Sequence, residues 1–393
     1  SYMVPKNIVI VGGNAGGGLL AARLSKILQD DQVNITVLDK QGKVEFQPSF
    51  TYVALGNRTE EQISKDFNYM TRKNVKPIKA EVTKVDAGNR TVYTKDAQYK
   101  YDILVLSPGV QLNDSKFPGY QDTYHFWDLK SALRLRTALA GFKKGKIVIS
   151  VASPIYKCPP VPWEMSMMLH EYFTNKGLRN NVEITVAHPM GRQFEMFGEN
   201  IAGPLGQWME EMKIGGVYKF LPAYADALKH ELVGENNERI KYDLAIVAPI
   251  QTAPDFVSNN DDLRSKVGWA DSNYNNFRNS KYDDIYSIGD VISPTLGMGM
   301  AGAFTHFEAD TVATFIADDV IGSYLTLPFN PVAMCAMEGG SYGWVAYCDF
   351  GRKLKNPSYV FNDCSLMDRG RIYKILHAVY EKYYYASILR GRV

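Results

Sequence analysis

One stretch near the amino terminus reads Ile8-Val9-Ile10-Val11-Gly12-Gly13-Asn14-Ala15-Gly16-Gly17-Gly18. The four β-branched residues predict a buried strand, the glycines a tight turn, and the apolar spacing that follows an amphipathic helix. In such a unit the glycines let backbone N–H groups approach a phosphate at the helix N-terminus. The fingerprint positions are Gly12, Asn14 and Gly17. Because asparagine replaces the middle glycine, the motif alone is an imperfect match.

A second predicted strand, Val33–Leu38, leads directly into Asp39 and Lys40. The carboxylate of Asp39 follows the glycines at about the distance where a ribose hydroxyl needs an acceptor. An ordinary glycine-rich turn before a helix is the alternative interpretation. Strand, helix and acid together favour a dinucleotide site.

Length and composition limit the class of protein. A chain of 393 residues exceeds one simple core and predicts two or three domains. With 46% hydrophobic and 22% charged residues the composition is that of a globular protein, and a net charge of +2 argues against wholesale nucleic-acid binding. We expect no secretory leader and no membrane-spanning helix, because the glycine-rich strand comes almost at once and no long uncharged apolar window exists.

The four cysteines are widely spaced and form no C-x-x-C motif; they are Cys158, Cys335, Cys348 and Cys364. We therefore expect neither a structural zinc site nor a disulfide framework, and we assign no metal ligand. A catalytic or redox pair remains open.

Two later strands also end in turns that suit a cofactor. The run Tyr101–Leu106 predicts a buried parallel strand that ends in Ser107-Pro108-Gly109, and Asp284–Ile288 ends in Gly289-Asp290. The glycines between residues 297 and 302 could start the next helix, which would point its N-terminus at the cofactor. An acidic turn after any buried strand is the alternative interpretation of Gly289-Asp290.

The middle of the chain repeats the strand–turn–helix pattern without its glycines. After the predicted strand Lys146–Val151 the sequence reads Ala152-Ser153-Pro154-Ile155-Tyr156-Lys157-Cys158-Pro159-Pro160. Proline lacks the N–H group that a phosphate cradle needs. The sequence therefore predicts a second Rossmann-like domain that has lost its nicotinamide-nucleotide site.

These patterns predict an α/β fold with two Rossmann-like dinucleotide-binding domains and a C-terminal membrane-associating segment. We expect the strand at Tyr242–Pro249 to return to the first domain. The expected parts are 1–118 and 241–326 for the first domain, 119–240 for the second, and 327–393 for a hairpin followed by an amphipathic helix. The basic, aromatic tail from Arg369 to Val393 suits a membrane surface and equally suits a helix docked on its own core.

In this order the motifs resemble sulfide:quinone oxidoreductase and the flavoprotein of flavocytochrome c sulfide dehydrogenase, within the flavin disulfide reductase superfamily. The resemblance covers nearly the whole chain. It is carried by the glycine-rich start, Phe46-Gln47-Pro48-Ser49, Ser107-Pro108-Gly109, Cys158-Pro159-Pro160 with Trp163-Glu164, Gly289-Asp290 and Cys335. It implies FAD, held by Gly12, Asn14, Ala15, Gly17, Asp39, Lys40, Pro48, Ser49, Val82, Ser107, Gly109, Gly289, Asp290 and Gly302.

The resemblance also implies a redox-active pair formed by Cys158 and Cys335. Cys348 is the alternative partner, and with Cys335 in the pair both Cys348 and Cys364 are interpreted as structural. Hydrosulfide can open such a disulfide and leave a persulfide. Cys158 stands just before a helix beside Lys157, so we expect a lowered thiol pKa. Glu164 is the candidate proton relay, and capping of the helix start is the alternative for it.

The chain departs from that family in two places. Many members have a third cysteine where this chain has Tyr124-His125-Phe126-Trp127-Asp128, and a lysine is missing between Gly289 and Glu308. The departures leave the length of the sulfur product open and predict non-covalent FAD.

The expected activity is oxidation of sulfide to polysulfide or zero-valent sulfur, with a membrane quinone as acceptor and monotopic association through the C-terminal helix. Its side of the membrane stays open, and a homo-oligomer is compatible with the sequence. The alternatives are a soluble sulfide dehydrogenase with a cytochrome acceptor and a single-subunit NADH:quinone oxidoreductase. Apolar walls for the quinone ring are assigned to Met334, Tyr347, Tyr383 and Tyr384.

Overall fold

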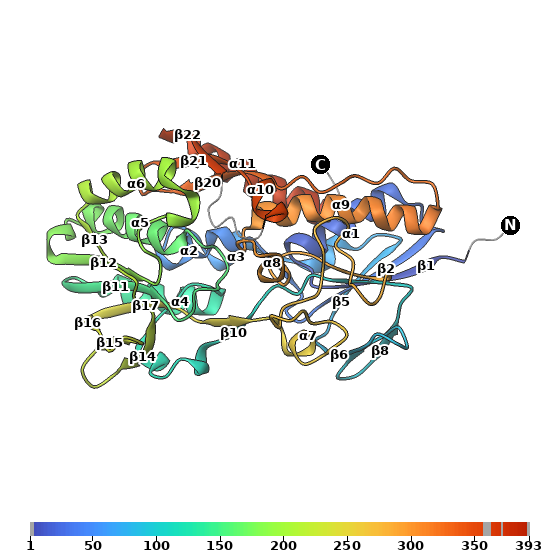
Figure 1. The fold of residues 1–393 in the computed structure, drawn as a ribbon, viewed down its shortest axis with the longest axis horizontal. Coiled ribbons are helices and arrows are strands. Elements are labelled where there is room, and N and C mark those ends of the chain that lie inside the picture. The colour runs from blue at the N-terminus through green and yellow to red at the C-terminus, as the bar shows by residue number, and fades with distance from the viewer. Residues whose placement is uncertain (1–3, 357–362, 371, 391–393) are drawn as a thin grey trace.

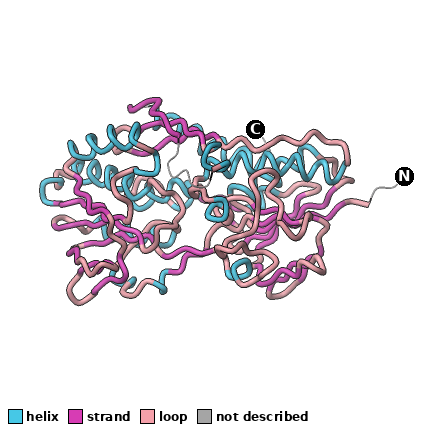
Figure 2. The backbone as a smooth tube through the Cα atoms, in the orientation of Figure 1, coloured by secondary structure: helices cyan, strands magenta, loops and turns pink. Residues whose placement is uncertain are grey.

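The computed structural model describes residues 4–356, 363–370 and 372–390. The chain forms two lobes side by side, and its last part lies across both along one edge (Figure 1). Each lobe is built on a parallel sheet with helices packed against it, as the tube view shows (Figure 2). The α/β class predicted from the sequence is confirmed.

The first lobe contains a five-stranded parallel sheet in the order β19-β9-β1-β2-β5. Its central strand β1 pairs with β2 and β9, so that Ile8 lies between Ile35 and Ile103. Ile8–Val11 are all buried, as expected for a central strand of a parallel sheet whose two faces are covered, and this explains the unbroken run of apolar residues. Helices α1 and α9 pack against each other beside the sheet. The bounds are β1 (Lys6–Val11), α1 (Ala15–Ile27), β2 (Val33–Asp39), β5 (Val75–Lys79), β9 (Ile103–Leu106), β19 (Ile285–Ser287) and α9 (Gly302–Ile321).

Small elements complete this lobe. Strands β6, β7 and β8 form an antiparallel sheet, and β3 pairs with β4. The bounds are β3 (Lys43–Glu45), α2 (Phe50–Ala54), α3 (Glu60–Ile63), β4 (Ser64–Asp66), β6 (Val82–Asp86), β7 (Thr91–Thr94), β8 (Gln98–Lys100), α7 (Asp255–Ser258) and α8 (Ser293–Leu296).

The second lobe contains a four-stranded parallel sheet in the order β13-β12-β11-β17 and a small antiparallel sheet, β14-β15-β16. The bounds are α4 (Leu129–Ala140), β11 (Gly145–Val151), α5 (Val161–Asn175), β12 (Val182–His188), α6 (Glu199–Glu211), β13 (Ile214–Tyr218), β14 (Pro222–Asp226), β15 (Glu231–Gly234), β16 (Arg239–Lys241) and β17 (Leu244–Ala248).

One predicted boundary is wrong. We expected the strand at Tyr242–Pro249 to return to the first domain, but β17 pairs with β11 from Ile147↔Leu244 to Val151↔Ala248. A run that is apolar throughout marks a strand as buried and does not say which of two buried sheets it joins. The crossing between lobes comes later, where β10 (Gln111–Asn113) pairs antiparallel with β18 (Ile250–Thr252).

The C-terminal part adds an antiparallel sheet, β20-β21-β22, and two helices. The predicted hairpin is confirmed as β20 (Val332–Glu338) and β21 (Gly343–Asp349), while β22 was not predicted. The remaining bounds are α10 (Gly351–Lys355), β22 (Asp363–Gly370) and α11 (Ile372–Arg390). No helix within the described ranges is long and apolar enough to cross a membrane.

Candidate active site

The glycine turn between β1 and α1 is closed so tightly that side chains are excluded. Gly12 has φ +103°, and a Cβ on it would lie 2.0 Å from the carbonyl oxygen of Ser107. A Cβ on Gly17 would lie 1.8 Å from the carbonyl oxygen of Gly12. Real Cβ atoms do not approach oxygen so closely, so the first and third fingerprint positions require glycine.

The middle fingerprint position has a different use. The Asn14 side-chain oxygen accepts the backbone N–H of Glu45 at 2.7 Å, which ties β3 to the start of α1. Asp39 accepts the Gly13 N–H at 3.0 Å through one carboxylate oxygen, while its other oxygen accepts the N–H groups of Gln41 and Gly42. The acid at the end of β2 is therefore fixed directly beside the glycine turn.

A cavity of 370 Å³ extends from this turn toward the second lobe. Seven of the residues assigned to the cofactor line it: Gly12, Asn14, Asp39, Lys40, Val82, Gly109 and Asp290. Ser107 and Gly17 lie behind the cradle and set its shape. Ala15, Pro48, Ser49, Gly289 and Gly302 do not line the cavity.

Two residues near the cavity have partners that the sequence did not suggest. Ala15 donates its N–H to the hydroxyl oxygen of Tyr384 at 3.2 Å, and the Ser49 hydroxyl lies 3.3 Å from Nε2 of His377. Both partners belong to α11. The C-terminal helix therefore contacts the cofactor lobe directly.

Lys157 and Trp127 also line the cavity, and the sequence analysis did not assign them to it. Lys157 is buried, and its ammonium donates to the side-chain oxygen of Gln47 at 3.0 Å. The indole N–H of Trp127 donates to the backbone oxygen of Lys157 at 2.9 Å. Burial raises the pKa of Asp290 to about 6, and the charge of Lys157 opposes that rise. In the sequence, the only feature that pointed to Lys157 was its place in a proline-rich turn.

The thiols of Cys158 and Cys335 are free and partly buried. Cys158 comes before α5 and donates its N–H to the Met300 oxygen at 3.1 Å, while Cys335 lies on β20 opposite Ala346. Burial raises the pKa of Cys158 to about 12, with a further rise from Asp290, and burial raises that of Cys335 to about 11. The prediction of a lowered pKa at Cys158 is wrong, because desolvation outweighs the helix start and Lys157.

The carboxyl of Glu164 acts on both thiols, because its charge raises the pKa of Cys158 and that of Cys335. It belongs to the first turn of α5, and its Oε2 accepts the backbone N–H of Glu338 at 2.8 Å. Burial raises its pKa to about 8. This carboxyl binds β20 rather than capping its own helix.

Beyond Glu338 the polar contacts continue to a second cavity. The Tyr52 hydroxyl donates to Oε2 of Glu338 and lies 3.2 Å from the Tyr373 hydroxyl. Tyr52, Glu338 and His377 line a cavity of 640 Å³ that is bounded by α2, α5 and α11. Polar contacts therefore lead from Glu164 through Glu338 and Tyr52 to this cavity.

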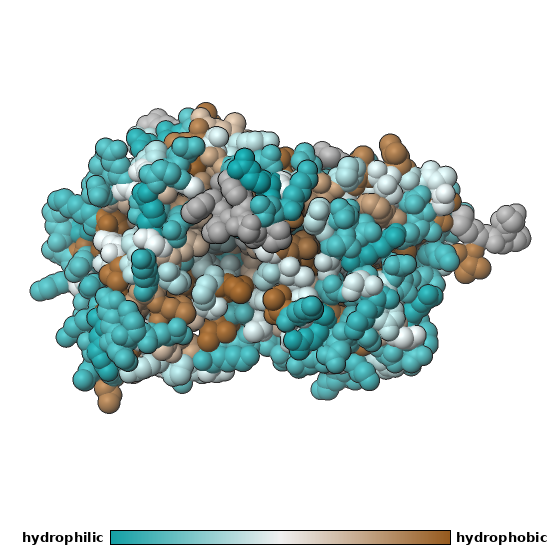
Figure 3. All heavy atoms as spheres, in the orientation of Figure 1, coloured by the Kyte–Doolittle hydropathy of each residue, from teal (hydrophilic) through white to brown (hydrophobic). Residues whose placement is uncertain are grey.

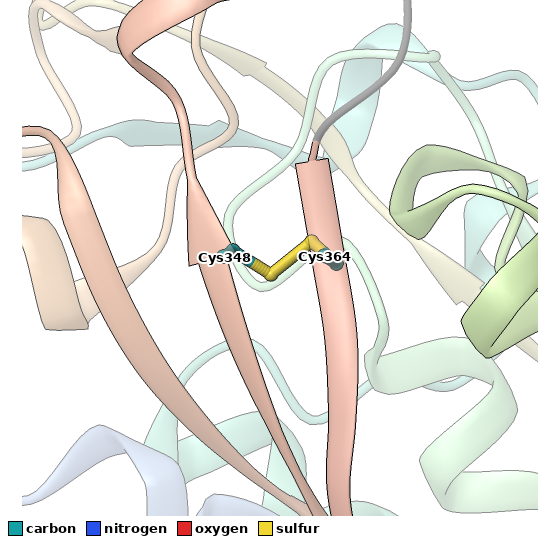
Figure 4. Close-up of a disulfide and its surroundings, with 2 residues drawn as sticks. All are labelled: Cys348 and Cys364. Carbon is teal, nitrogen blue, oxygen red and sulfur yellow. A yellow bond between two sulfur atoms is a disulfide. The ribbon is translucent and has the colours of Figure 1, made fainter.

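The other two cysteines form a disulfide between adjacent strands, as Figure 4 shows. Cys348 and Cys364 face each other in the register of β21 and β22, with 4.1 Å between their Cα atoms. Cys348 is thus occupied by Cys364 and is not a partner for Cys158 in this structure.

The four residues assigned to a quinone do not form one site. Met334 and Tyr347 are paired across β20 and β21, and both are exposed. Tyr383 accepts from Arg23 and, with Tyr384, lines a cavity of only 20 Å³. The hydroxyl of Tyr384 donates to the Glu45 oxygen at 2.9 Å. The prediction of a shared apolar wall is wrong.

Two known proteins are similar in sequence to this chain over most of its length. The chain is 22% identical over 413 residues to "Sulfide-quinone reductase" from Aquifex aeolicus (strain VF5), covering 99% of this chain and 92% of that protein. It is 23% identical over 298 residues to the mouse protein "Sulfide:quinone oxidoreductase, mitochondrial", covering 72% of this chain and 65% of the mouse protein's length.

The solved structure of the sulfide:quinone oxidoreductase from Aquifex aeolicus superposes with a TM-score of 0.85 at 19% identity, covering 98% of this chain and 92% of that chain. Its fold therefore matches nearly throughout. The family model described as "Pyridine nucleotide-disulphide oxidoreductase" matches residues 6–305. This chain belongs to the pyridine nucleotide-disulphide oxidoreductase family.

Proposed function

We propose that this protein oxidises sulfide to polysulfide or zero-valent sulfur with FAD as cofactor, and that the electrons go to a membrane quinone. The observation that carries the proposal is that Cys158 and Cys335 hold free thiols whose pKa values are both raised by Glu164, and that Cys158 directly follows Lys157, which lines the dinucleotide cavity. The names of the similar proteins from mouse and Aquifex aeolicus support it.

The residues of the first lobe fit FAD. Glycines leave the cradle at Gly12 free of side chains, Asp39 is fixed beside it, and Asp290 lies at the thiol side of the same cavity. Trp127 stands in the segment where a third cysteine would be expected, so FAD is held without a covalent bond. When bound, FAD accepts two electrons and passes them to the quinone.

The thiol pair supplies the sulfur chemistry. In the oxidised enzyme the bond between Cys158 and Cys335 is a disulfide, which hydrosulfide attacks at one sulfur. The S–S bond breaks, one cysteine takes up the incoming sulfur as a persulfide, and the other leaves as a thiolate. Attack by a second hydrosulfide on the outer sulfur of the persulfide would release the sulfur chain and free the first cysteine as a thiolate. The two thiolates would then rejoin as a disulfide, and the electron pair set free would be taken up by FAD when it is bound.

Glu164 is the proton donor in this proposal. With a pKa of about 8 its carboxyl holds a proton at neutral pH, and the proton is on Oε1, because Oε2 accepts the Glu338 N–H. A buried acid in this position can protonate the sulfur chain as it is released. The contacts through Glu338 and Tyr52 then connect it to the 640 Å³ cavity.

The test is anaerobic mixing of the purified yellow protein with sulfide and, separately, with NADH. We expect sulfide to bleach the flavin and NADH to leave it oxidised. Bleaching by NADH alone would overturn the proposal and favour a single-subunit NADH:quinone oxidoreductase. The turn at Ala152–Pro160, which has no glycine, argues against that alternative.

Cysteine variants test the assignment of the pair. Cys158→Ser and Cys335→Ser should each abolish bleaching by sulfide. The matched control is the double variant Cys348→Ser/Cys364→Ser, which removes both sulfurs of the structural disulfide and should keep the bleaching rate within about twofold. The reverse pattern would show that the wrong pair has been assigned.

For the membrane we propose an exposed apolar surface on the C-terminal part. It comprises Met334, Tyr347, Met367, Ile372, Ile375 and Val379, each 44% to 65% exposed. The opposite side of α11 is docked through Tyr384 and Tyr385, so one face of the helix binds the core and the other is free. Figure 3 shows that most of the surface on the visible face is hydrophilic.

Vesicle sedimentation tests this surface. The double variant Ile375→Glu/Val379→Glu should lose binding to anionic vesicles, because charge replaces apolar area at the interface. The control is Leu228→Glu, which adds one charge at a residue that is 96% exposed on the second lobe. Equal binding by all three proteins would contradict the surface and favour the soluble type with a cytochrome acceptor.

A further inference from the structure

The turn that carries Cys158 has an unfavourable backbone. Cys158 has φ +63°, in the left-handed region that residues with a side chain rarely adopt. The next residue is Pro159, and a residue before proline prefers an extended conformation. Such strain costs about 1–3 kcal/mol and persists only where the surroundings hold it. The structure must therefore contain contacts that fix this turn.

One such contact is a chain of hydrogen bonds that starts on β12. The Met190 N–H donates to Nδ1 of His188 at 3.1 Å, so the ring proton is on Nε2. Nε2 lies 2.8 Å from the Tyr156 hydroxyl and donates to it. That hydroxyl in turn donates to the Pro159 oxygen at 2.7 Å. Each of these three donors thus has a single acceptor, and the hydrogen bonds run in one direction from Met190 to Pro159.

The side chains of His188 and Tyr156 in this series of hydrogen bonds stay neutral around neutral pH. Burial lowers the pKa of His188 to about 3 and raises that of Tyr156 well above its ordinary value. The Trp163 ring lies against His188 with 4.5 Å between the ring centroids. A pair that neither titrates nor reaches solvent cannot relay protons. Its available role is to hold the turn.

The location of this pair explains what replaced the second nucleotide site. In a dinucleotide-binding unit the phosphate cradle lies between the end of the first strand and the following helix. Here those elements are β11 and α5, and Tyr156 occupies the space between them with Trp163 and His188. Side chains that fill the cradle also contact the backbone directly after Cys158.

We propose that Tyr156 and His188 are positioning residues, which hold Cys158 in its left-handed conformation and so fix the direction of its thiol. The proposal rests on the proposed function for its catalytic consequence only. The geometry of the turn can be tested without sulfide.

The experiment measures alkylation of Cys158 by iodoacetamide in the reduced holoenzyme, with Cys335 of the same chain as internal reference and mass spectrometry as readout. Tyr156→Phe releases the Pro159 oxygen, and the freed turn becomes more exposed. We expect the ratio of Cys158 to Cys335 labelling to rise at least about fivefold, and bleaching by sulfide to slow at least about tenfold with little change in KM.

Two further variants separate positioning from folding. Tyr156→Phe leaves the buried Nε2–H of His188 without an acceptor. Tyr156→Phe/His188→Phe removes that donor, at the cost of the acceptor of the Met190 N–H, so part of the lost stability returns. We expect the labelling ratio to stay raised in the double variant. Tyr242→Phe is the matched control, because it removes another buried tyrosine hydroxyl, which binds Asp122 in the same lobe.

A labelling ratio within twofold of wild type in both Tyr156 variants would overturn the proposal. So would an equal rise in Tyr242→Phe, since that would show general loosening of the lobe. If wild type fails to bleach with sulfide while the ratio still rises in the Tyr156 variants, the proposed function fails and the positioning role stands.

Discussion

The two strand–turn–helix units of this chain, β1 with α1 and β11 with α5, differ in their turns. After β1 the turn is glycine, and it leaves a cavity of 370 Å³ against the backbone. After β11 the turn carries Tyr156 and three prolines, and side chains fill the corresponding space. In the second turn, packed side chains therefore contact the backbone next to Cys158, where the first turn leaves open space.

The largest expected effect comes from closing the open turn. Gly12→Ala places a methyl group 2.0 Å from the Ser107 oxygen, where the backbone cannot yield. We expect the purified protein to carry at least about tenfold less flavin than wild type, measured by absorbance of the released cofactor.

Gly268→Ala is the control for this change. Gly268 also has positive φ, +85°, but nothing lies within 4 Å of its Cβ position. It should cost about 1 kcal/mol in the free energy of unfolding and keep its flavin. Equal loss of flavin in both variants would mean that conformational strain, and not the cradle, decides binding.

The side chains that fill the second turn should behave as part of a hydrophobic core when one of them is truncated. Trp163 is fully buried and packs on His188 and Phe194. Trp163→Ala should lower the free energy of unfolding by about 3–5 kcal/mol, measured by urea denaturation. Trp208→Ala, at a partly exposed site on α6, should cost less than half of that. Loss of flavin without loss of stability in Trp163→Ala would contradict the comparison.

The first lobe should lose stability as pH rises. Glu308 is buried, accepts the Gly289 N–H at 2.7 Å, and has a pKa raised by burial to about 8 from an ordinary 4.5. Between those values the folded state holds the extra proton, so stability falls with pH by up to about 1.4 kcal/mol per unit. Glu308→Gln should remove this contribution to the slope between pH 5 and 8, measured by denaturation. An unchanged slope would show that Glu308 is already ionised in the fold.

The second lobe should show the opposite sign at lower pH. Burial lowers the pKa of His188 to about 3 from an ordinary 6.5, so the unfolded chain binds the extra proton between those values. Stability should therefore fall as pH drops from 6.5, by up to about 1.4 kcal/mol per unit. His188→Gln should flatten this acid side of the curve while the fall above pH 7 remains. A steeper acid side would contradict the assignment of a neutral imidazole.

Much of the candidate site followed from sequence because its signals are local. The glycines at 12 and 17, the acid at 39 and the Gly-Asp turn at 289–290 each depend on a few neighbouring residues, and the structure gathers Gly12, Asp39 and Asp290 on one cavity. The disulfide of Cys348 and Cys364 agrees with their assignment as structural cysteines.

The parts that were wrong depend on contacts between distant segments. The pKa of Cys158 is set by burial and by Asp290, which no local rule about helix starts contains. Tyr384 reaches the first turn of α1 across almost the whole length of the chain. The strand β17 joins the second sheet because β11 is its partner, and its apolar run would fit either sheet.

By itself the sequence determined the α/β class, the open first turn and the absence of glycine in the second, because steric exclusion and the missing N–H of proline act on single residues. Only the tertiary structure decided which thiols stay free, where Lys157 points its charge and what holds Cys158 in its conformation. Those properties arise from burial and from hydrogen bonds between elements, which exist only once the lobes have packed.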